Sequence, residues 1–430
     1  MSTTNPINIK DLLDEERKYI QQCRCAKDGI DPNQYNSIQL EEDSLGIALS
    51  GGGIRSATIC LGIMQQLNTK RLIEKADYLS SVSGGGYLAS YIHHALHLEE
   101  PTPYNNLFAT QVINHLRDYR RYLFVWPGKW GQIFSWGWMI FLLLLSIIAG
   151  LLWLLLPFYY CKWTDCQLFS FNKAALIDIV WIVGLILLAG FLCSPNYTSP
   201  HLYYKCRLRR AYLWLNKSMK LKDLLNPKAP YPIINATVHV NYDRYDKSKL
   251  ASYRGRIKTN YFLFSPKYCG SQVTGYIPTD QHHYYKRTRL ATAMTTSAAA
   301  LHTFMGYKHL PISRLGLALL NIRMGIIAAN PKSKCWSPIF WPAYTFMEFF
   351  GISDTHRRRL QLSDGGHIEN LGIYELLRRR VKTIIAVDAG EDSKFDFFDL
   401  RNLVIRARNE LGLSITFEDH QNPTTISTSQ

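Results

Sequence analysis

The apolar positions of this 430-residue chain form several short runs and two long ones. The short runs predict buried strands at residues 45–49, 76–79, 231–240 and 381–388. The spacing of apolar residues predicts amphipathic helices at residues 9–23 and 399–411. Residues 290–303 are rich in alanine and threonine, which suits a closely packed helix. Because strands alternate with helices, the pattern predicts an α/β fold with a mostly parallel central sheet.

The two long runs predict a transmembrane helical hairpin. Residues 136–160 carry no charge, and Asp178 is the only charged residue in 174–193. Each run is long enough to cross a bilayer as a helix, and a short polar loop (161–173) joins them. Two alternatives are a buried helical pair in a soluble fold and a hairpin through which a soluble protein dimerises.

Basic residues flank the predicted hairpin on both sides. They are Arg117, Arg120, Arg121 and Lys129 before the first span, and Lys205, Arg207, Arg209 and Arg210 after the second. The loop holds only Lys162, Asp165 and Lys173. By the positive-inside rule, both chain ends lie in the cytoplasm and the loop lies outside.

The net charge of +16 is concentrated beside this hairpin. Residues 199–260 contain 14 lysines and arginines against 3 aspartates, a local balance of +11. A basic segment next to an apolar one favours an anionic lipid surface as partner, and no nucleic-acid motif accompanies it. The alternative is a solvated basic face.

Three turns rich in small residues carry the candidate chemistry. Ser50-Gly51-Gly52-Gly53-Ile54-Arg55-Ser56 and Ser80-Ser81-Val82-Ser83-Gly84-Gly85-Gly86 each follow a predicted strand and precede a predicted helix. The first turn can point backbone N–H groups at an anion, and the second can hold a serine hydroxyl clear of the backbone. Ser363-Asp364-Gly365-Gly366 supplies a carboxylate far downstream. Together the turns indicate acyl transfer by a serine.

In these three turns the chain resembles the patatin-like phospholipases. Their Gly-Gly-Gly-x-Arg segment, Gly-x-Ser-x-Gly elbow and Asp-Gly-Gly segment occur here in the same order, and the resemblance covers residues 43–105 and 229–412. Residues 364–372 are typical of bacterial members. Ser81 stands where the first glycine of the elbow is usual. The resemblance implies the patatin-like three-layer fold.

The resemblance also implies roles for individual residues. Ser83 is the expected nucleophile and Asp364 its base, in a Ser–Asp dyad that needs no metal or other cofactor. Oxyanion, elbow and Asp-turn positions are expected at Gly51, Gly52 and Gly53, at Ser81 and Gly85, and at Gly365 and Gly366. Arg55 binds the lipid phosphate or packs the turn.

Two alternatives to these roles involve phosphate and metal. The Gly51–Gly53 turn lacks the Gly-Lys-Ser/Thr ending and the spaced glycines of nucleotide-binding loops. His93 and His97 have the spacing of two metal ligands on a helix, but no third ligand is evident. Satisfied helix histidines are therefore the favoured interpretation.

The predicted organisation is a membrane-anchored serine lipid acyl hydrolase of the phospholipase A type, with its catalytic domain at the cytoplasmic face of a bacterial inner membrane. Its parts are a helical leader (1–42), the catalytic domain in two pieces (43–105 and 229–421), an insertion with the hairpin (106–228) and a disordered tail (422–430). The alternatives are a catalytically silent membrane scaffold or lipid-binding module, and an acyltransferase. The oligomeric state and any regulatory partner stay open.

Overall fold

The computed structural model describes most of the predicted α/β domain. The described residues are 5–28, 43–98, 100–119, 194–215, 218–240, 259–301, 323–334, 339–349 and 357–418, with single positions between 144 and 191. Apart from those single positions, the two predicted membrane spans lie outside the described residues, as do residues 241–258 and the predicted tail. Within these ranges, no helix combines the length and the apolar character needed to cross a membrane.

A nine-stranded sheet forms the centre of the described structure, in the order β6-β5-β4-β3-β2-β1-β9, with β8 paired to β3 and β7 paired to β8. The strands are β1 (Leu45–Leu49), β2 (Tyr78–Val82), β3 (Tyr231–His239), β4 (Thr259–Phe264), β5 (Tyr268–Ser271), β6 (Gly275–Pro278), β7 (Ile326–Ala329), β8 (Arg359–Asp364) and β9 (Thr383–Val387). Strands β3, β2, β1 and β9 run parallel, and the other pairings are antiparallel.

The sheet is therefore mixed, and the expectation of a mostly parallel sheet is correct only for four adjacent strands. Short connections join β4, β5 and β6, and such connections produce antiparallel neighbours. Strand β9 is parallel as expected, but it lies at the edge of the described sheet. Its residues Thr383 and Ala386 are exposed, so the prediction of a buried strand was wrong.

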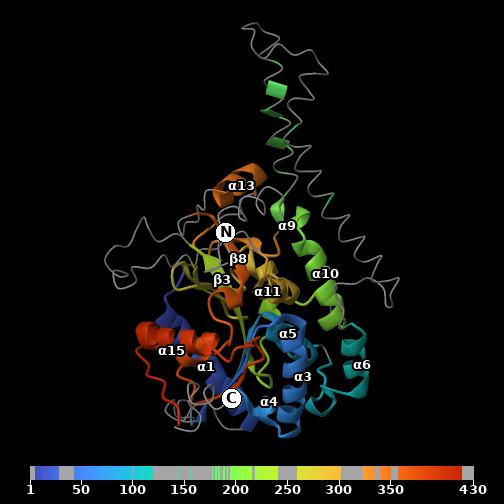
Figure 1. Cartoon of the computed structure of the whole chain (residues 1–430), viewed down its shortest axis with the longest axis vertical. Coiled ribbons are helices and arrows are strands. Elements are labelled where there is room, and N and C mark those ends of the chain that lie inside the picture. Colours follow the sequence, from blue (N-terminus) through green and yellow to red (C-terminus); the bar gives the residue numbers. More distant parts are fainter. Residues whose placement is uncertain are drawn as a thin grey trace.

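Helices cover both faces of the sheet, which gives the three layers that were predicted (Figure 1). The helices are α1 (Ile9–Asp28), α3 (Gly53–Thr69), α4 (Leu72–Lys75), α5 (Ser83–Leu96), α6 (Thr110–Asp118), α9 (Pro195–Thr198), α10 (His201–Tyr212), α11 (Leu290–Ser297), α13 (Trp341–Phe349), α14 (Tyr374–Arg378) and α15 (Phe398–Leu411). Helices α3, α5, α6 and α10 lie on one side, and α1 and α15 on the other.

The two faces follow from the alternation of side chains along each strand. In β1, Ile47 and Leu49 belong to the larger hydrophobic cluster with α5, whereas Ala48 belongs to the cluster with α1. Every residue of α5 is buried, because this helix lies between the sheet and other helices, with α3, α10 and α11 against it. The residue that begins α5 is therefore placed in the core of the molecule.

The predicted amphipathic helix at residues 9–23 is confirmed and continues to Asp28 as α1. Its apolar side chains Leu12 and Ile20 are buried against the sheet. The Glu16 carboxylate is also buried, and it accepts a 2.7 Å hydrogen bond from Nε of Arg379, 363 positions away. Helix α1 is thus held by a buried ion pair in addition to apolar contacts.

Glu16→Ala is expected to lower the free energy of unfolding by about 3 kcal/mol, because removing one partner leaves a buried charge with less compensation. Urea unfolding followed by circular dichroism measures the change. Glu15→Ala is the matched control: its 3.0 Å pair with Lys18 is exposed, so the loss should stay below about 1 kcal/mol. Equal effects of the two substitutions would contradict this account of α1.

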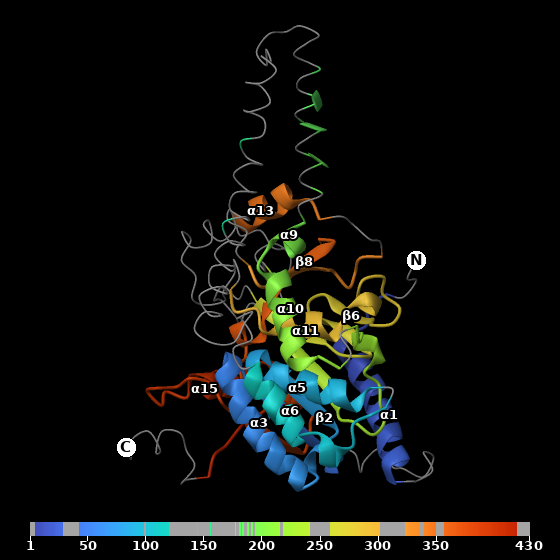
Figure 2. The same ribbon diagram turned by 90° about the vertical axis from the view of Figure 1, so that its right-hand side faces the viewer.

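Helix α10 connects the predicted insertion to the core. It lies beside α5 (Figure 2). Its residues Tyr204 and Leu208 lie in the larger hydrophobic cluster, and the Tyr204 hydroxyl is hydrogen-bonded to the Tyr87 hydroxyl of α5. Arg207, one of the flanking basic residues, is buried, whereas Arg210 is exposed. The basic segment is therefore only partly available to a lipid surface within the described residues.

Candidate active site

Ser83 occupies a sharp turn between strand β2 and helix α5. Its φ angle is 47°, in the left-handed region that residues with a side chain rarely adopt. This backbone conformation is typical of a nucleophile elbow, where the chain reverses and leaves the serine hydroxyl at the end of the strand. The side chain is 8% exposed, so it is buried but not sealed from solvent.

Asp364 ends strand β8, and its side chain meets Ser83. The Ser83 hydroxyl donates a 2.9 Å hydrogen bond to Oδ2 of Asp364 across 281 positions of sequence. The amide of Gly366 donates to the other carboxylate oxygen at 2.8 Å, which orients the group. The structure thus brings together the two residues that were predicted to react, because β2 and β8 pair with β3 one after the other along the same edge.

The surroundings of Asp364 raise its pKa to about 7, because burial disfavours the charged carboxylate. Hydrogen bonds from Gly366 and Ser83 oppose this shift and only partly offset it. A carboxylate with a pKa close to neutral pH is suited to accept a proton and return it within one reaction cycle.

The first glycine turn lies directly beside the elbow. A Cβ atom added to Gly84 would lie 2.1 Å from the carbonyl oxygen of Gly53, so only glycine allows this approach. Gly52 and Gly53 have φ angles of 135° and 65°, and α3 begins at Gly53. The first amides of a helix have no acceptor inside it, and the helix dipole adds positive potential there.

Gly51 differs from its two neighbours. Its amide donates a 2.8 Å hydrogen bond to the carbonyl oxygen of Asn370. This amide is therefore already engaged, and in this conformation Gly51 shapes the turn rather than presenting a free donor. A Cβ atom on Gly51 would lie 2.0 Å from Oδ1 of Asn370 and 3.1 Å from Cβ of Ser83, so the turn is closely packed.

The elbow accommodates Ser81 at the position where the patatin-like phospholipases usually have glycine. Ser81 is fully buried in β2, and its hydroxyl has no hydrogen-bond partner among the described residues. A Cβ atom added to Gly85 would lie 2.6 Å from the carbonyl oxygen of Leu49, so this second elbow glycine is required by packing against β1. The serine at position 81 therefore fits sterically, at the cost of one unsatisfied hydroxyl.

The Asp turn is equally restricted. A Cβ atom on Gly365 would approach the Asn235 carbonyl oxygen to 2.6 Å, and one on Gly366 would approach Asn370 Oδ1 to 2.8 Å. His367 follows these glycines, but its Nδ1 is hydrogen-bonded to the Ser363 hydroxyl at 2.8 Å and its Nε2 to the Ala300 carbonyl at 3.2 Å. Both ring nitrogens of His367 are thus hydrogen-bonded to groups other than Ser83 and Asp364.

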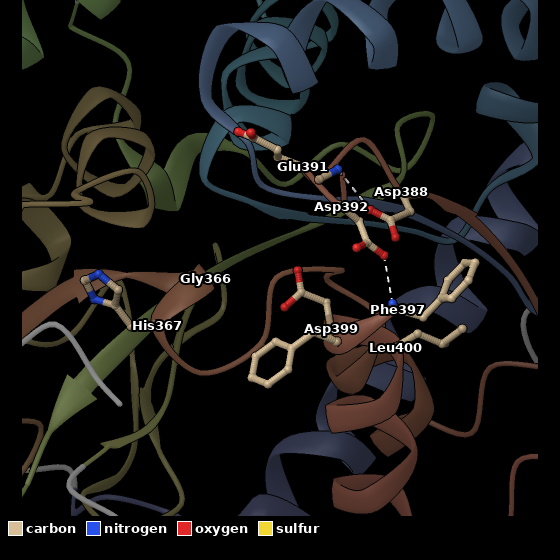
Figure 3. Close-up of a pocket in the computed structure, with 10 residues that line it drawn as sticks. Gly366, His367, Asp388, Glu391, Asp392, Phe397, Asp399 and Leu400 are labelled. Atoms are coloured by element: carbon tan, nitrogen blue, oxygen red, sulfur yellow. Dashed lines mark hydrogen bonds between the residues drawn. The ribbon is translucent and has the colours of Figure 1, made fainter. Parts of the chain in front are cut away.

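A cavity of about 350 Å³ adjoins the Asp turn. Figure 3 shows the carboxylates of Asp388, Asp392 and Asp399 gathered on one side of it and the His367 ring on the other. Neither Ser83 nor Asp364 lines this cavity. Arg55 is 81% exposed, and its Nη1 lies 3.9 Å from Oε2 of the exposed Glu391, which lines the cavity. Arg55 therefore stays a candidate for phosphate binding.

The described part of the chain contains no group of three or more His, Cys, Asp or Glu side chains arranged to hold a metal. The rings of His93 and His97 lie 6.1 Å apart, and Nδ1 of His97 is hydrogen-bonded to the His93 carbonyl oxygen. Burial lowers the pKa of both histidines.

Three polar residues of the site were not predicted. Asn370 connects the glycine turn to the Asp turn, and Asn235 donates from Nδ2 to the Ser80 hydroxyl at 2.9 Å. Ser297 accepts a 3.0 Å hydrogen bond from the Ser83 amide. Asn370 belongs to the Asp-Gly-Gly-His-Ile-Glu-Asn stretch, which offered a signal, whereas Asn235 and Ser297 lie in segments with no recognisable motif.

Comparison with known proteins supports the fold. No protein-family profile matches the chain. The putative meiotic phospholipase SPO1 of Saccharomyces cerevisiae is 37% identical over 54 residues, which are 13% of this chain and 9% of that protein. Human GIVD cytosolic phospholipase A2 matches with a TM-score of 0.50 and 14% identity, over 96% of this chain and 53% of the human chain. Its complex with methyl gamma-linolenyl fluorophosphonate gives a TM-score of 0.41 at 14% identity, over 96% and 49%.

The chain thus spans about half the length of the human structure and less than a tenth of the yeast protein. The two named relatives come from yeast and human, so the bacterial assignment stays a prediction. The same holds for membership of the patatin-like family. The chain has a phospholipase-like α/β fold with a mixed central sheet.

Proposed function

We propose that the chain is a membrane-anchored serine lipid acyl hydrolase of the phospholipase A type. The observation that carries this proposal is the 2.9 Å hydrogen bond between Ser83 and Asp364, formed at a positive-φ elbow in a buried site. A strained serine held against a carboxylate with a pKa of about 7 is the arrangement that a Ser–Asp nucleophile requires. The phospholipase-like fold adds independent support for a lipid ester as the substrate.

In the proposed reaction, Ser83 Oγ attacks the carbonyl carbon of a lipid ester while its proton passes to Asp364. The bond between that carbon and the lipid alcohol then breaks, and Asp364 returns the proton to the leaving oxygen. Water attacks the acyl-serine next, giving its proton to Asp364, and the fatty acid leaves as Ser83 regains the proton. Every proton in these steps moves between Ser83, Asp364, the leaving alcohol and water.

The negative charge that develops on the carbonyl oxygen needs donors fixed in advance. We assign this role to the amides of Gly52 and Gly53, since the Gly51 amide is bonded to Asn370 in the structure. The dipole of α3 adds to their effect. Arg55, exposed on the first turn of α3, is assigned to the phosphate of the lipid headgroup.

Exposed apolar side chains support the membrane anchor. In the second predicted span, every described position except Gly184 carries a large apolar side chain that is at least 44% exposed. They are Ile177, Val180, Trp181, Val183, Leu187, Leu188 and Phe191. A bilayer would cover such side chains, whereas water leaves them unfavourably exposed. From the flanking positive charges, we infer that both termini and the catalytic domain lie in the cytoplasm.

The first test is fatty-acid release from vesicles that contain phosphatidylcholine, phosphatidylethanolamine and phosphatidylglycerol, using detergent-purified protein. Release of free fatty acid with the matching lysophospholipid is the expected result. No release from folded protein would contradict the proposal and favour the alternative, a catalytically silent membrane scaffold or lipid-binding module.

The rate of hydrolysis is expected to depend on pH through Asp364. Only the ionised carboxylate accepts the serine proton, so kcat/KM should rise about tenfold per pH unit below the pKa and level off above about pH 7. The measurement is kcat/KM from about pH 5 to about pH 9, with a neutral ester whose own charge does not change. A rate that is constant from pH 5 to pH 8 would exclude Asp364 as the base.

A further inference from the structure

A short segment that begins with the last residue of α11 contacts both members of the Ser83–Asp364 pair. We call Ser297, Ala298, Ala299 and Ala300 the 297–300 segment. The Ser297 hydroxyl accepts from the Ser83 amide at 3.0 Å, and the Ala299 carbonyl accepts from the Asp364 amide at 3.3 Å. One short stretch of chain therefore holds the backbone of the nucleophile and the backbone of the base.

The Ser297 hydroxyl accepts a hydrogen bond from an amide that has no acceptor within helix α5. Ser83 begins α5, so its amide has no acceptor inside that helix. The Ser297 hydroxyl donates its own hydrogen to the Asn235 carbonyl at 2.6 Å, which turns a lone pair toward Ser83. Ser297 is fully buried, so water is not positioned to replace it.

The rest of the segment is anchored to separate elements. The Tyr204 hydroxyl of α10 donates to the Ala298 carbonyl at 3.1 Å, and His367 is bonded to the Ala300 carbonyl at 3.2 Å. The predicted helix 290–303 ends at Ser297 because this segment leaves the helix to make these contacts. Each of its four residues is thus fixed by a hydrogen bond to a residue near the candidate site.

We propose that Ser297 is a positioning residue of the nucleophile, which it acts on through the Ser83 backbone. The proposal rests on Ser83 being the nucleophile. By fixing the strained elbow, Ser297 sets the distance and direction from Ser83 Oγ to Asp364 Oδ2. A misplacement of reacting groups by about 1 Å, even when caused by a mutation far from the chemistry, can lower the rate about a hundredfold. Loss of this contact should therefore lower kcat far more than it raises KM.

The test compares Ser297→Ala with the matched control Ser90→Ala. Ser90 is equally buried, lies on α5, and has a hydroxyl with no partner among the described residues. Ser297→Ala is expected to lower kcat by between about tenfold and a hundredfold, while KM stays within about twofold of the wild-type value. Labelling of Ser83 by an alkyl fluorophosphonate should slow by the same factor as kcat. Ser90→Ala should match the wild type. Ser297→Thr keeps the hydroxyl and should recover most of the labelling rate.

Each outcome decides the question. Labelling of Ser297→Ala at the wild-type rate would overturn the proposal, as would a Ser297→Thr variant no faster than Ser297→Ala when both are folded. If Ser297→Ala unfolds at the assay temperature, Ser297→Cys takes its place, because a thiol fills the same space but accepts hydrogen bonds weakly. If Ser297→Cys has the wild-type kcat and the wild-type labelling rate, the proposal that Ser297 positions Ser83 is also overturned. A folded wild type that neither labels nor hydrolyses would overturn the proposed function itself, and this inference with it.

Discussion

Ser83→Ala is expected to reduce fatty-acid release by about 10⁴- to 10⁶-fold, to the level of a protein-free vesicle sample. Alanine removes the only atom that attacks the ester in the proposed mechanism, and it leaves no group that could form the acyl-enzyme. The measurement is free fatty acid and lysophospholipid over time from mixed vesicles. Loss of covalent labelling by an alkyl fluorophosphonate should accompany it.

Ser81→Gly is the matched control for this substitution, two positions earlier in the same turn. The Ser81 hydroxyl has no partner among the described residues, and glycine is the residue that the resembled family has there. We expect this variant to keep its activity. Residual hydrolysis by Ser83→Ala above a hundredth of the wild-type rate, or loss of hydrolysis in Ser81→Gly alone, would contradict the assignment of the nucleophile.

Asp364→Asn is expected to lower kcat by about 10⁴-fold while the protein stays folded. Asparagine has nearly the same shape and still accepts the Gly366 amide hydrogen, but it cannot take a proton from Ser83. The measurement is single-turnover hydrolysis of a neutral ester above pH 7. Asp388→Asn is the control, since Asp388 directly follows strand β9 but is exposed and lies in the neighbouring cavity.

Stability provides a second readout for Asp364. Its pKa is raised from an ordinary value of 3.8 to about 7 by burial, so the folded protein binds a proton that the unfolded chain releases. The free energy of unfolding therefore falls as pH rises through this interval, and above it the wild type holds an unfavourable buried charge. Asp364→Asn should melt at the same temperature as the wild type or higher at pH 8. A large decrease in melting temperature would instead indicate that the carboxylate stabilises the fold.

The sequence predicted that Ser83 and Asp364 lie close together, and the structure shows the contact. The prediction was possible because both residues lie in turns with a strong local signature. Ser83 follows strand β2, Asp364 is the last residue of strand β8, and each precedes a glycine, so both lie in turns that restrict the chain locally. The confirmed helices α1 and α15 also have patterns that depend only on local spacing.

What sequence reasoning missed depends on contacts between distant segments. The Gly51 amide was expected as a free donor, but it is bonded to Asn370, which lies more than three hundred residues away in sequence. Strand β9 has the apolar character of a buried strand, yet its place at the sheet edge follows from pairing with β1. Periodicity within a segment does not reveal which partner that segment will have.

The order of the strands has a consequence for the newly made protein. A ribosome that has finished α5 has produced the nucleophile but not its base, which lies 281 positions later. At about 5 to 20 residues per second, the interval between the two is roughly 15 to 55 seconds. Strand β9, which pairs with β1, and Arg379, which pairs with Glu16, emerge later still. In the proposed mechanism, the nascent chain therefore cannot hydrolyse a lipid ester until the ribosome has passed Asp364 and the strands that hold it.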